Sequence, residues 1–408
     1  MASEHAHHWT LDPAVDFLNH GSYGATPRPV LAAQQRWRER MEAEPVRFFS
    51  HDLEPALDAA RAALATFLGC ESQDLALVPN ATAGTNSVLR SLRLAPGDEL
   101  LTTDHAYNAA RNAMEFVAER DGARVVVASV PFPLSSTEQV TDALLRRVTP
   151  RTRLAVVDHI TSATALILPV RELVAELTAR GVETLIDGAH AAGQVTLSIP
   201  ELGASFYAGS LHKWVSAPKG AGFLWVRRDR QPAIHPLAIS HGANSTRADR
   251  SRFRLEFDWT GTADPSAHLA VPDAIRFGDQ LLPGGWEALR SRNHHLALEA
   301  RDIVCAALGI DPPVPDPMLG SMASIALPGE SGEGTVQGVD LYGDPIHDAL
   351  DAQGLQVMIT PWPQRPEGGP WRRLVRISAA AYNDSAQYRR LAAALPATIA
   401  AIAVTAQA

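Results

Sequence analysis

Between about residues 53 and 228 the chain alternates between two hydrophobic patterns. Stretches with apolar residues three or four positions apart predict helices, and short continuous apolar runs between them predict buried strands. This alternation predicts an α/β fold, with a mostly parallel sheet flanked by helices on both faces. The predicted helices span 55–68, 108–120, 138–148 and 170–180, and the predicted strands span 75–78, 99–102, 124–129, 153–158, 183–186 and 222–226.

A stretch rich in proline and glycine, LLPGGW at 281–286, interrupts the alternating pattern. Shorter strands and helices follow it and predict a smaller α+β C-terminal domain at 281–408, after a large domain at 49–280. The N-terminal segment 1–48 includes a predicted helix at 29–44, which we expect to pack on the small domain or on a partner subunit. A chain of 408 residues is long enough for two such domains.

Composition narrows the class of protein. The chain is 46% hydrophobic and 20% charged, and its net charge of −9 argues against nucleic acid as a partner. It has no apolar run long enough for a membrane helix and no N-terminal signal pattern. Its two cysteines are far apart and near no His/Cys cluster, so we expect neither a disulfide framework nor a metal site. These features predict a cytoplasmic protein without a membrane partner.

Polar residues follow two of the apolar runs. The sequence reads LIDGAH at 185–190 and GSLHKW at 209–214. Alone, the aspartate is explained equally well by a structural cap, and the lysine by a surface loop. Together they match pyridoxal 5′-phosphate (PLP), which needs a lysine amine for its aldehyde and a carboxylate to keep its pyridine nitrogen protonated. Lys213 and Asp187 supply these groups, and His190 is placed to reach the ring hydroxyl.

A phosphate site is also predicted. The stretch NATAGT at 80–85 follows a strand and opens a helix, so its small residues expose backbone N–H groups at a helix N-terminus. Thr82 and Ala83 lie in that turn, and Ser210 and His212 flank the lysine as further donors. Only Lys213 and Lys219 are lysines among the 36 basic residues, so the cofactor lysine has two candidates.

Six motifs in order, together covering about residues 17–395, resemble the class-V aminotransferase family. Within it, the chain is most similar to the isopenicillin N epimerase-like branch, through NHGSYG, EPVRFF (44–49) and DHITSATALILPV (158–170). The six motifs are NHGSYG (19–24), NAT (80–82), DHITS (158–162), DGAH (187–190), SLHKW (210–214) and RIS (376–378) with Tyr382-Asn383.

The resemblance implies a fold-type I PLP-dependent transferase architecture with a seven-stranded sheet. It also implies a homodimer with shared active sites acting on a small amino-acid substrate. Arg376 matches the arginine that holds the substrate α-carboxylate, a task that suits a planar guanidinium. The resemblance also implies roles for further residues. Thr262 is expected to reach the cofactor phosphate in the neighbouring subunit. Ser162 is expected near the ring oxygen or the substrate amine, and Asn19 and His20 near the substrate.

Two positions stay open. Either Tyr107 or His105 is expected to stack on the ring, with Tyr107 favoured, and Tyr107 is also a candidate acid–base residue. Arg47, beside Phe48 and Phe49, is a candidate for a second substrate carboxylate. The stretch MITPW at 358–362 lacks the cysteine of cysteine desulfurases, which disfavours desulfuration.

The reaction expected is Cα proton abstraction by Lys213 after the substrate amine replaces it on the cofactor in an external aldimine. Epimerisation needs a second acid–base group across the ring, for which Tyr107, His105 or His20 are candidates. C–S β-elimination from a cysteine S-conjugate, in natural-product biosynthesis for instance, needs only a leaving group. Decarboxylating or oxidative deamination of such a conjugate is a third possibility, and a non-catalytic protein of this fold a fourth.

Overall fold

The computed structural model describes residues 3–332, 343–363, 365 and 371–407. Its centre is a seven-stranded sheet in the order β2-β8-β7-β6-β5-β3-β4, in which β8 runs antiparallel to its two neighbours and the other strands are parallel. The prediction of a mostly parallel sheet is therefore confirmed. The strands are β2 (Leu75–Val78), β3 (Glu99–Thr103), β4 (Arg124–Ala128), β5 (Thr152–Asp158), β6 (Glu183–Asp187), β7 (Phe206–Ser210) and β8 (Gly222–Val226).

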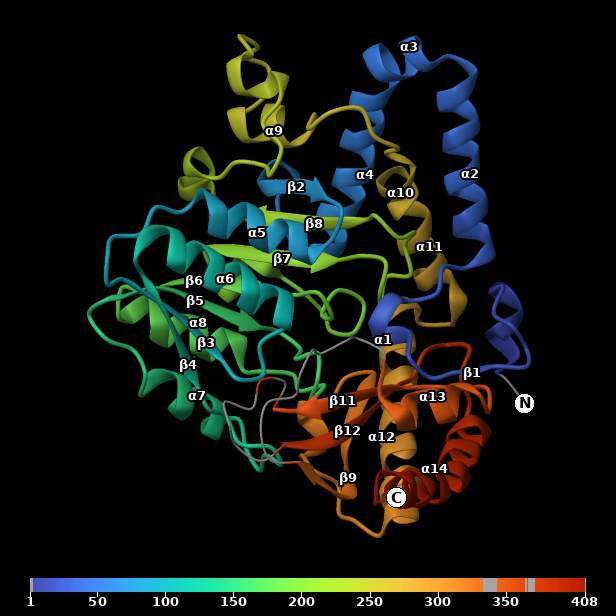
Figure 1. The fold of residues 1–408 in the computed structure, drawn as a ribbon. Helices are drawn as coiled ribbons and strands as arrows, with labels where there is room; N and C mark the ends of the chain where they lie inside the picture. Colours follow the sequence, from blue (N-terminus) through green and yellow to red (C-terminus); the bar gives the residue numbers. More distant parts are fainter. Residues whose placement is uncertain (1–2, 333–342, 364, 366–370, 408) are drawn as a thin grey trace.

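Helices cover both faces of this sheet (Figure 1). Alternation along β5 shows why: Leu154 and Val156 pack in one buried apolar cluster, and Ala155 and Val157 pack in the other. A parallel strand buried on both faces must be apolar at nearly every position. The helices of this part are α4 (Leu53–Leu68), α5 (Ala81–Ser91), α6 (Asn108–Asp121), α7 (Glu138–Leu145), α8 (Val170–Ala179), α9 (Arg252–Phe257), α10 (Ser266–Leu269) and α11 (Val271–Leu281).

A smaller antiparallel sheet forms the C-terminal part, in the order β11-β12-β9, with α12 and α14 beside it (Figure 1). This confirms the prediction of a small α+β domain, although its exact boundary at 281 stays a prediction. The elements are α12 (Gly285–Leu308), β9 (Met322–Gly332), α13 (Pro345–Asp351), β10 (Leu355–Gln356), β11 (Met358–Trp362), β12 (Trp371–Ser378) and α14 (Ser385–Gln407).

The N-terminal residues contact both parts of the chain. β1 (Asp16–Phe17) pairs with β10 of the C-terminal part, while α2 (Arg28–Ala43) packs on α10 and α11. The short α1 (His20–Tyr23) lies between the two sheets, and α3 (Pro45–Arg47) lies at the far end of α2 (Figure 1). None of the helices in the described residues is long and apolar enough to cross a membrane.

Candidate active site

The candidate site lies where several strands of the large sheet end. β5 ends at Asp158, β6 at Asp187 and β7 at Ser210, and α5 begins just after β2. In a parallel sheet these carboxyl ends meet at one edge, which is where ligands bind in such folds. α1 and β12 approach the same edge, so residues from distant parts of the sequence come together there.

Lys213 stands in the turn that follows β7. Its Nζ lies 3.1 Å from His190 Nε2. Burial lowers the pKa of Lys213 to about 7, with Arg376 adding to the shift and Asp187 and Asp158 opposing it. A lysine amine in this environment is substantially unprotonated at neutral pH, which makes it a nucleophile and a proton acceptor.

The tautomer of His190 follows from its neighbours. The indole Nε1–H of Trp214 can only donate, and it lies 3.4 Å from His190 Nδ1. Burial and the nearby cations hold the pKa of His190 well below its usual value, so the ring is neutral. Nε2 therefore carries the ring proton and donates it toward the Lys213 amine.

Two buried carboxyl groups stand next to each other at the strand ends. Asp158 and Asp187 are paired in register on β5 and β6, and each is only 5% exposed. Burial raises the pKa of both, and the charge of Asp187 adds to the rise at Asp158. The backbone N–H of Ala189 donates to Asp187 Oδ1 at 3.0 Å, and Tyr107 N–H bonds to the carboxyl of Asp158. Sequence reasoning gave a role to Asp187 but none to Asp158, although Asp158 begins the DHITS motif and ends a predicted strand in the same way.

The first turn of α5 has the backbone arrangement of an anion site, but two of its N–H groups already donate hydrogen bonds to side chains of the protein. Asn80 Oδ1 caps the helix by accepting from Ala83 N–H at 2.9 Å, and Ser210 Oγ accepts from Ala81 N–H at 3.1 Å. A Cβ on Gly222 would stand 2.6 Å from the Cα of Asn80, so the strand–helix turn needs glycine there. The N–H of Ala83 is thus already bonded, and Thr82 is exposed in the same turn.

His212 provides an acceptor or donor without a partner. Its Nδ1 is buried and makes no hydrogen bond within the part of the chain that the structure describes. Burial lowers the pKa of His212 to about 4, so the ring is neutral at physiological pH. A buried polar atom left unbonded is costly unless a ligand satisfies it.

Arg376 on β12 is 2% exposed and faces this edge of the sheet. One guanidinium nitrogen donates to Ser162, to its carbonyl at 2.8 Å and its Oγ at 3.2 Å. The other donates to Asn19 Oδ1 at 3.2 Å and to Ser22 Oγ at 2.8 Å. The structure therefore brings Arg376, Asn19 and Ser162 together, and adds Ser22, which the sequence analysis did not single out.

Two predicted histidines need correction as candidate acid–base groups. The ring nitrogens of His20 lie 2.7 Å from Tyr382 Oη and 2.8 Å from the Lys213 carbonyl. Those of His105 lie 2.7 Å from Thr164 Oγ1 and 3.0 Å from the Val130 carbonyl. Because both rings are buried and fully bonded within the protein, neither has a nitrogen available for a substrate.

His105 and Tyr107, the two ring-stacking candidates, differ in their surroundings. The ring of His105 packs against Trp362, with ring centroids 4.2 Å apart. Tyr107 is half-buried and directly precedes α6, where its backbone N–H is bonded to Asp158. Of the two side chains, Tyr107 is the one that is not enclosed in the core.

Arg47 and Thr262 do not join this group within the chain. Arg47 lies on α3, at the end of α2 remote from α1 (Figure 1), and its exposed side chain is 3.8 Å from Glu44. The prediction that Arg47 lines the substrate pocket is therefore not met within one chain. Thr262 is exposed in the connection between α9 and α10, and no described contact links it to Lys213.

Taken together, the sheet and the lysine site define a fold-type I PLP-dependent enzyme. Residues 18–328 match the family described as Aminotransferase class-V. The chain belongs to the class-V aminotransferase family.

Two curated relatives are similar over nearly the whole chain. An isopenicillin N epimerase of Amycolatopsis lactamdurans is 36% identical, over 95% of this chain and 96% of that protein. A putative L-cysteine desulfhydrase 2 of Oryza sativa subsp. japonica is 33% identical, over 96% of this chain and 85% of that protein. Among solved structures, a C-DES mutant with glycine covalently linked to its PLP cofactor has a TM-score of 0.77 at 19% identity, covering 95% of this chain and 98% of that one.

The cofactor of this enzyme is PLP, and the residues of the site fit it. A lysine amine with a pKa of about 7 suits the cofactor aldehyde, and the buried Asp187 suits a pyridinium N–H. The buried Nδ1 of the half-buried His212, which has no hydrogen bond within the described residues, suits a phosphate group.

Proposed function

We propose that this enzyme catalyses proton transfer at the α-carbon of an amino acid, with Lys213 as the base. The observation that carries the proposal is the environment of Lys213. Its buried amine has a pKa of about 7 and receives a hydrogen bond from His190 Nε2. PLP, when bound, withdraws electrons from the α-carbon and so acidifies the proton that Lys213 removes.

The other residues take positioning roles in this proposal. Arg376 holds the α-carboxylate of the substrate, with Asn19, Ser22 and Ser162 setting the plane of its guanidinium. Asp187 pairs with the pyridine nitrogen, and His190 stands near the ring hydroxyl. Tyr107 covers the ring face. The phosphate is bound at the α5 N-terminus by Thr82, Ser210 and His212, while the N–H of Ala83, a further predicted donor, stays on Asn80.

We propose an isopenicillin N epimerase-like reaction as the first candidate. Lys213 removes the α-proton on one face, and a second group returns a proton on the other. With His20 and His105 bonded within the protein, Tyr107 is the remaining candidate for that second group. The 36% identity to the Amycolatopsis epimerase, over almost all of both chains, supports this choice.

C–S β-elimination from cysteine or a cysteine S-conjugate is the second candidate. The same occupied histidines favour it, because elimination requires no acid–base group on the opposite face of the ring. The rice relative named as a putative L-cysteine desulfhydrase supports it as well. The two reactions share Lys213, Arg376 and the first proton transfer, and they diverge only after that transfer.

One experiment separates them. The PLP-loaded enzyme is incubated in D₂O with isopenicillin N, a panel of amino acids and cysteine S-conjugates. The α-proton is followed by NMR, and pyruvate, ammonia and released thiol are assayed. Deuterium at Cα in both epimers without pyruvate supports epimerisation, whereas pyruvate with a thiol supports elimination. Release of CO₂, or no exchange at Cα with any candidate, contradicts the proposal.

A Tyr107→Phe variant tests the proposed second group. We expect epimerisation to fall about 100-fold, the usual range for loss of a general acid–base. Exchange of the α-proton with retention of configuration should continue, since Lys213 is unchanged, and it serves as an internal control. Equal loss of both signals would contradict the role of Tyr107.

Two further roles extend beyond a single chain. We propose a homodimer in which Thr262, exposed between α9 and α10, reaches the phosphate site of the neighbouring subunit. Sedimentation of the purified protein would show the oligomeric state, and a monomer with full cofactor affinity would contradict this arrangement.

A further inference from the structure

The residues Asn19–Tyr23, here called the NHGSY segment, connect two parts of the site that are far apart in the sequence. Asn19 and Ser22 accept hydrogen bonds from Arg376. The Nε2 of His20, which lies between them in the sequence, is 2.8 Å from the carbonyl of Lys213. The segment thus contacts both the proposed carboxylate-binding arginine and the backbone of the proposed base.

The direction of each hydrogen bond at His20 follows from its partners. A carbonyl can only accept, so His20 Nε2 carries the ring proton and donates it to Lys213. Nδ1 then accepts, with Tyr382 O–H at 2.7 Å as the nearer donor and the backbone N–H of Ala25 at 3.4 Å as the second. Burial lowers the pKa of His20 to about 4, which keeps the ring neutral and this single tautomer in place. The result is a chain of hydrogen bonds from Tyr382 through His20 to Lys213.

Close packing reinforces the contact with the lysine turn. The His20 ring lies 4.8 Å from the ring of Trp214, the residue after Lys213. Gly24 ends α1 with a positive φ of 67°, and a Cβ there would stand 2.0 Å from the His212 carbonyl. Since there is no free space between the end of α1 and the lysine turn, a shift of α1 must be transmitted to that turn.

The NHGSY segment is equally fixed to the strand that carries Arg376. The backbone N–H of Gly21 donates to Ser378 Oγ at 3.1 Å, and that of Ser378 donates to the Leu18 carbonyl at 2.8 Å. Ser378 is two residues beyond Arg376 on β12, and Tyr382 follows in the turn before α14. Movement of Arg376 and movement of His20 are therefore linked through the same short stretch of backbone.

We propose that the His20–Tyr382 pair acts as a positioning device, which couples the binding of a substrate carboxylate at Arg376 to the position of Lys213. This rests on the proposed function in taking Arg376 as the carboxylate site. A carboxylate arriving at the guanidinium competes with Asn19 and Ser22 for its N–H groups. The resulting adjustment of the NHGSY segment passes through His20 to the Lys213 carbonyl.

Hydrogen exchange with a simple carboxylate tests the coupling. Propanoate has the carboxylate of a substrate but no amine, so it can bind at Arg376 without displacing Lys213. In the wild-type holoenzyme we expect propanoate to slow amide exchange in peptides covering residues 209–217. In Tyr382→Phe, which removes only the hydroxyl, that slowing should be lost, while the inhibition constant for propanoate stays within about twofold because the partners of Arg376 are intact.

Kinetics supply a second readout. Loss of one buried hydrogen bond that positions the base should lower kcat about tenfold with little change in KM. Tyr388→Phe is the matched control. Tyr388 is another fully buried tyrosine of the C-terminal part, and its hydroxyl donates to the Ser378 carbonyl at 2.7 Å rather than to His20. Its variant should keep the propanoate effect on residues 209–217.

His20→Asn provides an independent route if Tyr382→Phe is poorly folded, and the same loss of coupling is expected. Propanoate slowing that persists in both variants, or that is missing from the wild type, would overturn the proposal. The outcome is independent of the reaction itself. If propanoate slows exchange as expected but no amino acid exchanges its α-proton, the proposed function is contradicted and the positioning role stands. If an amino acid exchanges its α-proton but propanoate has no effect on residues 209–217, the positioning role is contradicted and the proposed function stands.

Discussion

Lys213 and Lys219 are the only two lysines of the chain, which makes them a natural pair of variants. Lys213 Nζ is beside His190, whereas Lys219 Nζ donates to the carbonyl of Gly24 at 2.9 Å. We expect Lys213→Ala to lose the visible absorbance of lysine-bound PLP and to lose α-proton exchange. Lys219→Ala should keep both. Absorption spectra of the two variants after PLP loading and dialysis decide the point, and the reverse pattern would contradict the assignment.

The residue scale also shows which site residues sequence reasoning can propose and which it cannot. Lys213 and Asp187 could be proposed because each stands in a short motif and has a chemistry that few other residues supply, whereas Arg376, one of many arginines, was proposed from the family resemblance. The histidines were harder to interpret. His20 bonds to Tyr382, a residue 362 positions away, and His105 bonds to Thr164, 59 positions away. No local pattern records such partners, and they decide whether a histidine nitrogen is available for chemistry.

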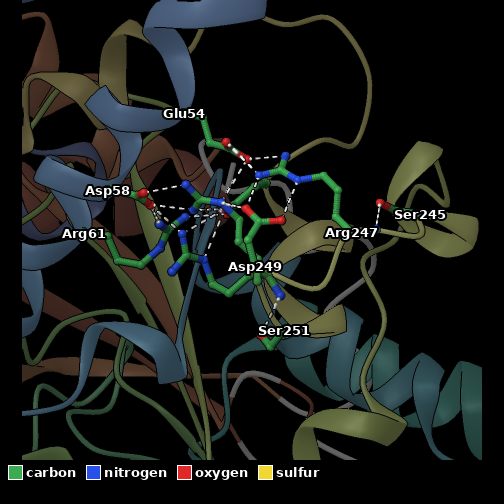
Figure 2. A network of polar contacts seen from close by, with 10 residues as sticks. Glu54, Asp58, Arg61, Ser245, Arg247, Asp249 and Ser251 are labelled. Carbon is green, nitrogen blue, oxygen red and sulfur yellow. Dashed lines mark hydrogen bonds and ion pairs between the residues drawn. The ribbon is translucent and has the colours of Figure 1, made fainter.

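At the scale of helices and strands, a network of arginines and carboxylates joins α4 to α9 (Figure 2). Arg61 on α4 has a side chain that is 0% exposed, and it pairs with Asp58 and with Asp258 just after α9. Asp258 also accepts from Arg254. The network fixes the start of the connection that carries Thr262, so its integrity matters for the proposed contact across subunits.

Asp258→Asn tests this network. Removing the Asp258 charge leaves the buried Arg61 paired only with the partly exposed Asp58, which we expect to cost about 1–3 kcal/mol in the free energy of unfolding. Urea denaturation would measure the loss. Asp249→Asn is the control, because Asp249 is exposed and pairs with the half-exposed Arg247 (Figure 2). It should change stability little, and a similar loss in both variants would show that burial of Arg61 is not the cause.

The sheet shows which elements the hydrophobic pattern can predict. Six of the seven strands were recognisable as apolar runs, but β7 (Phe206–Ser210) was not, although it lies in the middle of the sheet. Its sequence FYAGS has no β-branched residue and ends in small ones. The structure explains this, since a Cβ on Gly209 would stand 2.3 Å from the ring of Phe223 on β8. Packing against an aromatic neighbour, rather than strand propensity, determines that sequence.

On the scale of the whole molecule, the site is assembled from the two ends of the chain and from its middle. Asn19 and His20 come from the N-terminal residues, and Arg376 comes from the small sheet. Asp158, Asp187 and Lys213 lie at or just after the ends of strands of the large sheet. Lys213 and Asp187 were proposed from their own motifs, and the family resemblance added Asn19, His20 and Arg376, while neither gave a role to Asp158. The coupling among its members depends on contacts such as those of Ser22 and Tyr382, which only the folded chain reveals.

Burial of Lys213 also predicts how the stability of the PLP-free protein varies with pH. The pKa of Lys213 is about 7 in the folded chain and has an ordinary value of 10.5. Between these values the unfolded chain binds more protons than the folded one, so stability rises with pH across this window. Arg376, Asp187, Asp158 and His190 face the amine and contribute to the same titration.

Thermal unfolding of the PLP-free wild type and of PLP-free Lys213→Met, from about pH 7 to about pH 10, tests this directly. Methionine fills a similar volume without a charge, so the difference between the two proteins isolates the lysine. The wild type should gain melting temperature relative to Lys213→Met as the pH rises, because the cost of burying an ammonium disappears once the amine is neutral. Lys219→Met is the matched control and should follow the wild-type curve more closely, since Lys219 is less buried and its pKa is lowered less. Parallel curves for wild type and Lys213→Met would mean that the Lys213 amine titrates near its ordinary pKa. Lys213 could then act as a base at neutral pH only if the bound cofactor lowered that pKa.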